Sequence, residues 1–294
     1  MPRVLACFGL VAVAYFWRTF GAPPPLRQQQ ALRERVSVAL SVSGASRGAL
    51  VIDKFADGLL QHAVNPALAT HDFEAFVWLQ DDSAEEGLCR RLRASSAVHT
   101  CAMRHVLAPS DDETAAIARD HLPSLYGSAW RGNATTNTIR MLWKLRGIEK
   151  LRLTHLASFG HSTHDWVLRV RPDLELLAPL RLPPVASAVY VPWRCASAEL
   201  VFDQLLLLPG TIAGGAPGGA EALLAALYMP ETLLRVALRS EPPSLYPERL
   251  VHHALSVFGL RDWPGGVDVR LLGSAGEARD AFGKLKSDFP GCFP

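Results

Sequence analysis

Short apolar runs alternate with helix-like stretches along most of the chain. This alternation predicts an α/β fold with a single mixed, mostly parallel sheet flanked by helices. We expect an irregular tail after the last helix. The strand-like runs cover residues 36–42, 73–80, 98–107, 189–193 and 202–210. The helix-like stretches cover residues 50–62, 89–95, 113–122, 135–153, 221–228 and 247–259.

The most regular alternation lies in residues 165–176, which read DWVLRVRPDLEL. Successive side chains of a strand point to opposite faces, so arginines and carboxylates share one face and large apolar residues the other. Pro172 has no backbone N–H, and regular strand pairing should stop near it. The polar face holds Arg169, Arg171, Asp173 and Glu175, and the apolar face holds Trp166, Leu168, Val170, Leu174 and Leu176.

Asp173 and Glu175 then lie where a strand gives way to a loop, which is where open α/β sheets place their ligands. Two carboxylates at positions i and i+2 can share one divalent cation, and oxygen ligands suit Mg²⁺ or Mn²⁺. A cation held there could bridge two phosphate groups. The alternative is an exposed strand face on which the arginines pair with the acids.

The first residues of the chain have a different pattern. Residues 4–17 are uncharged, follow Arg3 and are closed by Arg18. The run is shorter than the roughly 20 apolar residues that cross an average bilayer, which suits a short signal anchor, a cleaved signal peptide or a buried helix. No clear small-residue cleavage site follows, which favours the anchor. We therefore expect a membrane anchor over residues 1–21, a stem over 22–34 and one α/β domain over 35–294.

Composition narrows the class of protein. The chain has 294 residues, 49% of them hydrophobic, and a formal net charge of +2. It can bury a core, and so balanced a charge argues against a nucleic-acid binder.

Four cysteines beyond Cys7 allow two disulfides, with Cys89–Cys101 the most local pairing, and buried free thiols are the alternative. Asn133 begins an Asn-Ala-Thr sequon, a glycosylation signal in the secretory lumen.

The predicted helix over residues 135–153 has an apolar side and a basic side. We interpret the basic side as a solvated helix face, because charged residues at this spacing usually face water. The apolar side holds Leu142, Leu145, Ile148 and Leu151, and the basic side holds Arg140, Lys144, Arg146 and Lys150.

Several motifs follow one another between residues 36 and 260. They are the turn Ser43-Gly44-Ala45-Ser46-Arg47, the strand HDWVLRVRPDLEL after a basic helix, Phe202-Asp203-Gln204, and Pro247-Glu248 at a helix start. In this order they resemble type II membrane or secreted glycosyltransferase-like proteins with a nucleotide-diphospho-sugar transferase fold. The acidic motif departs from the Asp-x-Asp form, which bears on metal dependence more than on the fold.

The resemblance implies a role for each matching residue. The nucleotide sugar would be bound by Ser43, Gly44, Arg47, Arg171 and Asp173. Mn²⁺ or Mg²⁺ would be held by Asp173 and Glu175. Asp203 would be the general base that deprotonates an acceptor hydroxyl, with Glu248 as a second catalytic candidate. The structural alternatives are an ion pair for Arg169 and helix capping or dipole complementation for Asp203 and Glu248.

The function that the resemblance implies is transfer of a sugar from a nucleotide-sugar donor to a glycan, glycoprotein or lipid. The protein would be a single-pass type II membrane protein of the Golgi or endoplasmic reticulum with a luminal catalytic domain. The alternative is a non-catalytic, membrane-tethered relative of the same fold that binds carbohydrate or has a structural role. Convergence of Asp173 and Asp203 on one site would favour the enzyme.

Overall fold

The computed structural model describes residues 35–79, 82–103, 116, 132–159, 163–183, 188–210, 247–255, 259–281 and 283–292, without the side chains of 132–137, 254, 284 and 285. Arg35–Pro294 forms one compact unit. The expected anchor and stem, the helix predicted at 221–228 and nearly all of the one at 113–122 lie outside the described residues. Within them, no helix combines the length and apolar character needed to cross a bilayer.

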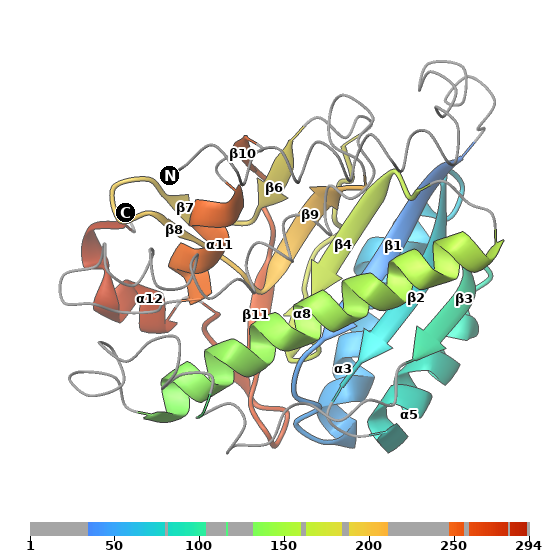
Figure 1. Cartoon of the computed structure of the whole chain (residues 1–294), viewed down its shortest axis with the longest axis horizontal. Coiled ribbons are helices and arrows are strands. Elements are labelled where there is room, and N and C mark those ends of the chain that lie inside the picture. Colours follow the sequence, from blue (N-terminus) through green and yellow to red (C-terminus); the bar gives the residue numbers. More distant parts are fainter. Residues whose placement is uncertain are drawn as a thin grey trace, which may run out of the picture. The chain divides into compact units, whose positions relative to one another are not determined.

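A seven-stranded sheet with the order β10-β6-β9-β4-β1-β2-β3 forms the centre of this unit (Figure 1). Strand β1 runs parallel to β2 and β4, β2 to β3, and β6 to β10. Only β9 is antiparallel to its neighbours, β4 and β6. The predicted mixed, mostly parallel sheet is confirmed. Its strands are β1 (Val36–Ser43), β2 (His71–Trp78), β3 (Val98–Met103), β4 (Trp166–Val170), β6 (Val189–Val191), β9 (Leu205–Pro209) and β10 (Leu260–Asp262).

Helices cover both faces of the sheet because the strands are apolar on both faces. Val38, Leu40 and Val42 of β1 pack in one core with the helices that follow β1 and β2. Ala39 of β1 and Phe76 of β2 pack in a second core with a long helix that crosses the other face (Figure 1). The first group is α3 (Ala49–Leu59), the π-helical turn η1 (Leu60–Val64), α4 (Asn65–Ala67) and α5 (Asp82–Arg93). The second group is α8 (Gly132–Phe159) and α11 (Pro247–Leu255).

Two smaller sheets accompany the main one. The expectation of an irregular tail is wrong, because the chain after residue 260 supplies short strands and helices. The strands are missed in the sequence because segments of two to four residues carry too little hydrophobic pattern. One sheet joins β5 (Leu174–Leu176), β11 (Val269–Leu272) and β12 (Ala278–Arg279), and the other joins β7 (Arg194–Cys195) to β8 (Leu200–Val201). The chain continues into α12 (Gly283–Asp288) and the 3₁₀ turn η3 (Pro290–Cys292).

Two disulfides cross-link the fold. Cys89–Cys101 joins α5 to β3, and Cys195–Cys292 joins β7 to η3. The first is the local pairing that the sequence predicted. The alternative, buried free thiols, is wrong for these four cysteines.

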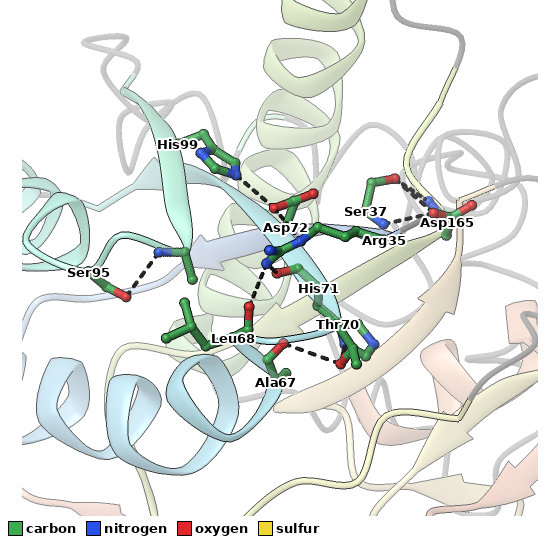
Figure 2. Close-up of polar contacts among 11 residues, drawn as sticks. Arg35, Ser37, Ala67, Leu68, Thr70, His71, Asp72, Ser95, His99 and Asp165 are labelled. Atoms are coloured by element: carbon green, nitrogen blue, oxygen red, sulfur yellow. Dashed lines mark hydrogen bonds and ion pairs between the residues drawn. The ribbon is translucent and has the colours of Figure 1, made fainter. Parts of the chain in front are cut away.

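Polar contacts close the edge of the sheet where the parallel strands begin (Figure 2). Arg35 donates to the carbonyl oxygens of Leu68 and His71 and pairs with Asp72 at 3.0 Å. Asp165 accepts hydrogen bonds from the backbone N–H and the hydroxyl of Ser37, which fixes the start of β4 beside β1. Side chains of this edge are engaged with one another and with the backbone, whereas open α/β sheets bind ligands at the opposite, carboxyl edge.

Candidate functional site

The carboxyl ends of β1 and β4 are the topological switch point of the sheet. From β1 the chain moves to β2 and β3 on one side, whereas β4 pairs with β1 on the other side. The connections after β1 and β4 therefore leave in opposite directions, and ligands of open α/β sheets bind at such points. Ser43 ends β1 and Arg171 follows β4 directly, so the motifs predicted from the sequence meet at this edge.

The turns after β1 and β4 are in direct contact. A Cβ on Gly44 would lie 2.7 Å from Cδ of Pro172, so only glycine lets the two turns approach this closely. The Gly44 N–H donates to the Trp78 carbonyl at 3.3 Å, and Lys144 of α8 donates to the Gly44 carbonyl at 3.3 Å. The Gly44 turn is thus held from both sides by groups more than thirty residues away in sequence.

Asp173 is buried and lies between two arginines. Arg171 donates from Nε and Nη2 to the two carboxylate oxygens at 3.0 and 2.7 Å. Nε of Arg47 lies 2.8 Å from the same Oδ2, so Asp173 joins the β1 turn to the β4 turn. Burial lowers the pKa of Arg171, but its attraction to Asp173, Asp203 and Glu248 outweighs this and raises the pKa overall. The side chains of Arg47 and Arg171 are 39% and 27% exposed, respectively.

Arg47 adopts an unusual backbone conformation to reach Asp173. Its φ of 47° lies in the left-handed region, which costs a non-glycine residue roughly 1–2 kcal/mol. Such strain persists where surrounding contacts hold it, and it gathers at ligand sites. The ion pair with Asp173 is one such contact in this turn.

Arg169 is the unsatisfied member of the cluster. Its side chain is buried, and Nε, Nη1 and Nη2 have no hydrogen-bond partner among the described residues. Burial lowers its pKa to about 10, Asp203 and Asp173 oppose the shift, and Arg171 adds to it. The structural alternative, a close ion pair for Arg169, is absent among the described residues. Asp203 and Asp173 attract the guanidinium without a direct contact to it.

Lys144 is the functional candidate that sequence reasoning missed. The basic side of α8 was expected to face water, and Arg146 and Lys150 do, but Lys144 is only 5% exposed. Burial lowers its pKa to about 8, Arg140 and Arg171 contribute to the lowering, and Glu85 opposes it. Burying a charged lysine beside two other cations costs free energy unless an anion approaches it. The one sequence signal was its position between Leu142 and Leu145, both of which are buried.

Asp203 and Glu248 lie at the same edge of the sheet. Asp203 is buried just before β9, and the carbonyl of its neighbour Gln204 accepts the Arg171 N–H at 3.0 Å. Glu248 occupies the first turn of α11, where a carboxylate also complements the helix dipole. Because both Asp173 and Asp203 act on Arg169 and Arg171, the two aspartates converge on one charge cluster.

Glu175 lies apart from this cluster. It is on β5, pairs with Arg270 of the neighbouring strand β11, and packs its Cγ against Gly58 of α3. Asp173 and Glu175 are thus each engaged by different arginines. Among the described residues, no three His, Cys, Asp or Glu side chains are grouped so that they could hold a metal ion. The donor set therefore does not fit a cation shared by Asp173 and Glu175.

The predicted glycosylation residue Asn133 lies in the first turn of α8. The described side chains of this helix begin at Thr138, so the environment of the Asn133 amide is outside the described part. Its glycosylation stays a prediction.

Comparison with known proteins gives matches in structure alone. No family model and no curated protein match the chain. Mouse xyloside xylosyltransferase 1, in its apo form, has a TM-score of 0.43 and 10% identity over 77% of this chain and 85% of that one. The galactosyltransferase LgtC with donor and acceptor sugar analogues has a TM-score of 0.40 and 8% identity, over 76% of this chain and 72% of LgtC. An active-site mutant of LgtC gives 0.41 and 9% over the same shares.

Proposed function

We propose that the chain is a glycosyltransferase that moves a sugar from a nucleotide-sugar donor to a glycan, glycoprotein or lipid acceptor. The observation that carries the proposal is the charge cluster at the switch point of the sheet. Arg47 and Arg171 pair there with Asp173, and Asp173 also acts on the buried Arg169. Lys144 donates to the glycine turn after β1. Guanidinium and ammonium groups at such an edge suit the phosphates of a nucleotide sugar.

Asp203 is the group that we assign to the acceptor. A general base must lie beside the bound donor, and Asp203 acts on the same two arginines as Asp173. Asp173 has a different role in this proposal. It orients Arg47 and Arg171 toward the phosphates and is a positioning residue. The convergence of the two aspartates favours an enzyme over a non-catalytic carbohydrate-binding relative.

The proposed location is the lumen of the Golgi or endoplasmic reticulum, with residues 4–17 as the anchor. Two disulfides support an oxidising compartment, because cytosolic thiols are kept reduced. Carbonate extraction tests the anchor, since a full-length chain released into the supernatant would contradict it.

The experiment is a screen of full-length protein, purified in detergent, against a panel of UDP-, GDP- and CMP-sugars by thermal shift and donor hydrolysis. We expect one donor to stabilise the protein and to be consumed. Asp203→Asn should bind that donor but lose turnover, whereas Asp173→Asn should raise KM for the donor by about tenfold, because Arg47 and Arg171 lose the carboxylate that orients them.

Asp262→Asn is the matched control, because Asp262 is an exposed aspartate that pairs with Arg194 away from the cluster. It should behave like the wild type. A chain that responds to none of the donors would contradict the proposed function. Wild-type turnover by Asp203→Asn would show that Asp203 is not the general base.

A further inference from the structure

The charges around Asp173 bear on how the diphosphate of a donor is neutralised. Asp173 already accepts two hydrogen bonds from Arg171 and an ion pair from Arg47. A divalent cation bound to Asp173 would have to displace guanidinium groups and remain beside Arg169 and Arg171. Like charges at such short range repel strongly where burial reduces the screening by water.

Lys144 and Arg169 carry positive charge and have N–H donors for which the described residues supply too few acceptors. The Lys144 ammonium has three N–H donors, and its hydrogen bond in the described part of the chain goes to the Gly44 carbonyl. The guanidinium of Arg169 is buried with no hydrogen-bond partner. Buried donors of this kind are expensive unless a ligand satisfies them.

The exposed and the buried members of the cluster would contribute to binding in different ways. Arg47 and Arg171 are partly exposed, and a guanidinium can bind phosphate oxygens through two parallel hydrogen bonds. Lys144 reaches the carbonyl of Gly44, so its ammonium group lies at the turn that faces the ligand. Arg169 lies behind these groups and adds a positive charge in a region with little water.

We propose that Arg47, Lys144 and Arg171, with Arg169 behind them, neutralise the diphosphate of the ligand in place of a divalent cation. This inference rests on the proposed function for the identity of the ligand, but its test does not. The donor would bind equally well in the absence of metal. Sugar transfer would need no metal to stabilise the leaving diphosphate, because the same side chains hold its negative charge.

The test uses inorganic pyrophosphate as the probe, with the full-length protein in detergent and binding measured by calorimetry and thermal shift. We expect pyrophosphate to bind in EDTA and to gain no affinity from added Mn²⁺. Lys144→Met should weaken binding by about tenfold or more, as expected when a buried charged contact to an anion is lost. Lys150→Met is the matched control, since Lys150 is exposed on the same helix, and it should bind like the wild type.

Arg47→Gln provides a second variant, because Arg47 is partly exposed and its replacement leaves the core intact. It should also weaken pyrophosphate binding. A requirement for Mn²⁺ or Mg²⁺, or wild-type binding by both Lys144→Met and Arg47→Gln, would overturn the inference.

The two proposals fail in different ways. Pyrophosphate binding in EDTA without a response to any nucleotide sugar would leave the anion site standing and remove the glycosyltransferase. Turnover of a nucleotide sugar only in the presence of Mn²⁺ would leave the glycosyltransferase standing and remove the metal-free site.

Discussion

Arg152 and Arg169 are two buried arginines in opposite situations. Arg152 donates from Nε and Nη2 to Glu149 and from Nη1 to Nδ1 of His164. Nδ1 must accept from an arginine, so Nε2 of His164 carries the proton and donates to Glu74 at 2.8 Å. Burial lowers the pKa of His164 and Arg152 contributes to the lowering, although Glu74 opposes it, which fits a neutral ring.

Arg169 has none of these partners in the described residues. The Arg152 cluster satisfies its donors within the described residues, as a cluster that stabilises the fold does. The Arg169 guanidinium keeps unsatisfied donors at the carboxyl edge of the sheet, which costs stability. Burial of a charge therefore does not by itself mark a functional site, whereas a buried charge without partners at a switch point makes that position a candidate site.

The largest effect should come from Arg152→Met. The substitution leaves the buried carboxylate of Glu149 without its partner, and breaking one side of a buried ion pair costs roughly 3–5 kcal/mol. Urea unfolding measures the loss. Arg146→Met, at an exposed position of the same helix, is the control. A loss no larger than that of the control would mean that the Arg152 cluster is not structural.

A smaller effect should follow the titration of Lys144. Its pKa is 10.5 in the unfolded chain and about 8 in the fold, so the unfolded state binds more protons between these values. Stability should therefore rise with pH from about 8 to 10.5, by about 3 kcal/mol for this one group. The charges that act on Lys144 are Arg140 of its own helix, Glu85 of α5 and Arg171 after β4.

Unfolding by urea at a series of pH values measures this rise. Lys144→Met should flatten it, and Lys150→Met should retain it. An identical rise in Lys144→Met would show that Lys144 is not the group that titrates.

The smallest change in stability, and one of opposite sign to that of Arg152→Met, should come from Arg169→Met. Methionine fills a similar volume without a charge, and replacing buried ionic groups by apolar residues of similar volume ranges from neutral to a gain of about 1–4 kcal/mol. The free protein should therefore unfold at higher urea concentration. Pyrophosphate should stabilise it less than it stabilises the wild type. A loss of stability would mean that Arg169 has a structural role, in which its charge compensates the buried Asp203.

The fold was predictable where the pattern is local. Trp166, Leu168, Val170, Leu174 and Leu176 all lie in one core, as the alternation predicted. Pairing stops at Pro172, after which β5 joins another sheet. The alternation is a property of neighbouring residues, so the sequence contains it in full.

The site was predictable only in part, because its contacts join distant segments. Arg47 and Asp173 were assigned to one site through motif order, but their ion pair spans turns after two different strands. The hydrogen bond of Lys144 to Gly44 joins residues 100 positions apart, and no spacing within α8 indicates it. The pairing of Glu175 with Arg270, which separates Glu175 from Asp173, depends on the late strand β11.

The two disulfides differ in when synthesis allows them to close. Cys89 and Cys101 are 12 residues apart, whereas Cys195 must wait for 97 further residues before Cys292 is made. At roughly 5–20 residues per second this delay is about 5–20 s. In an oxidising compartment, the first pair can already be closed when the Cys195 thiol emerges. Cys195 then meets no competing partner among these four cysteines, and vectorial synthesis itself selects the correct bond.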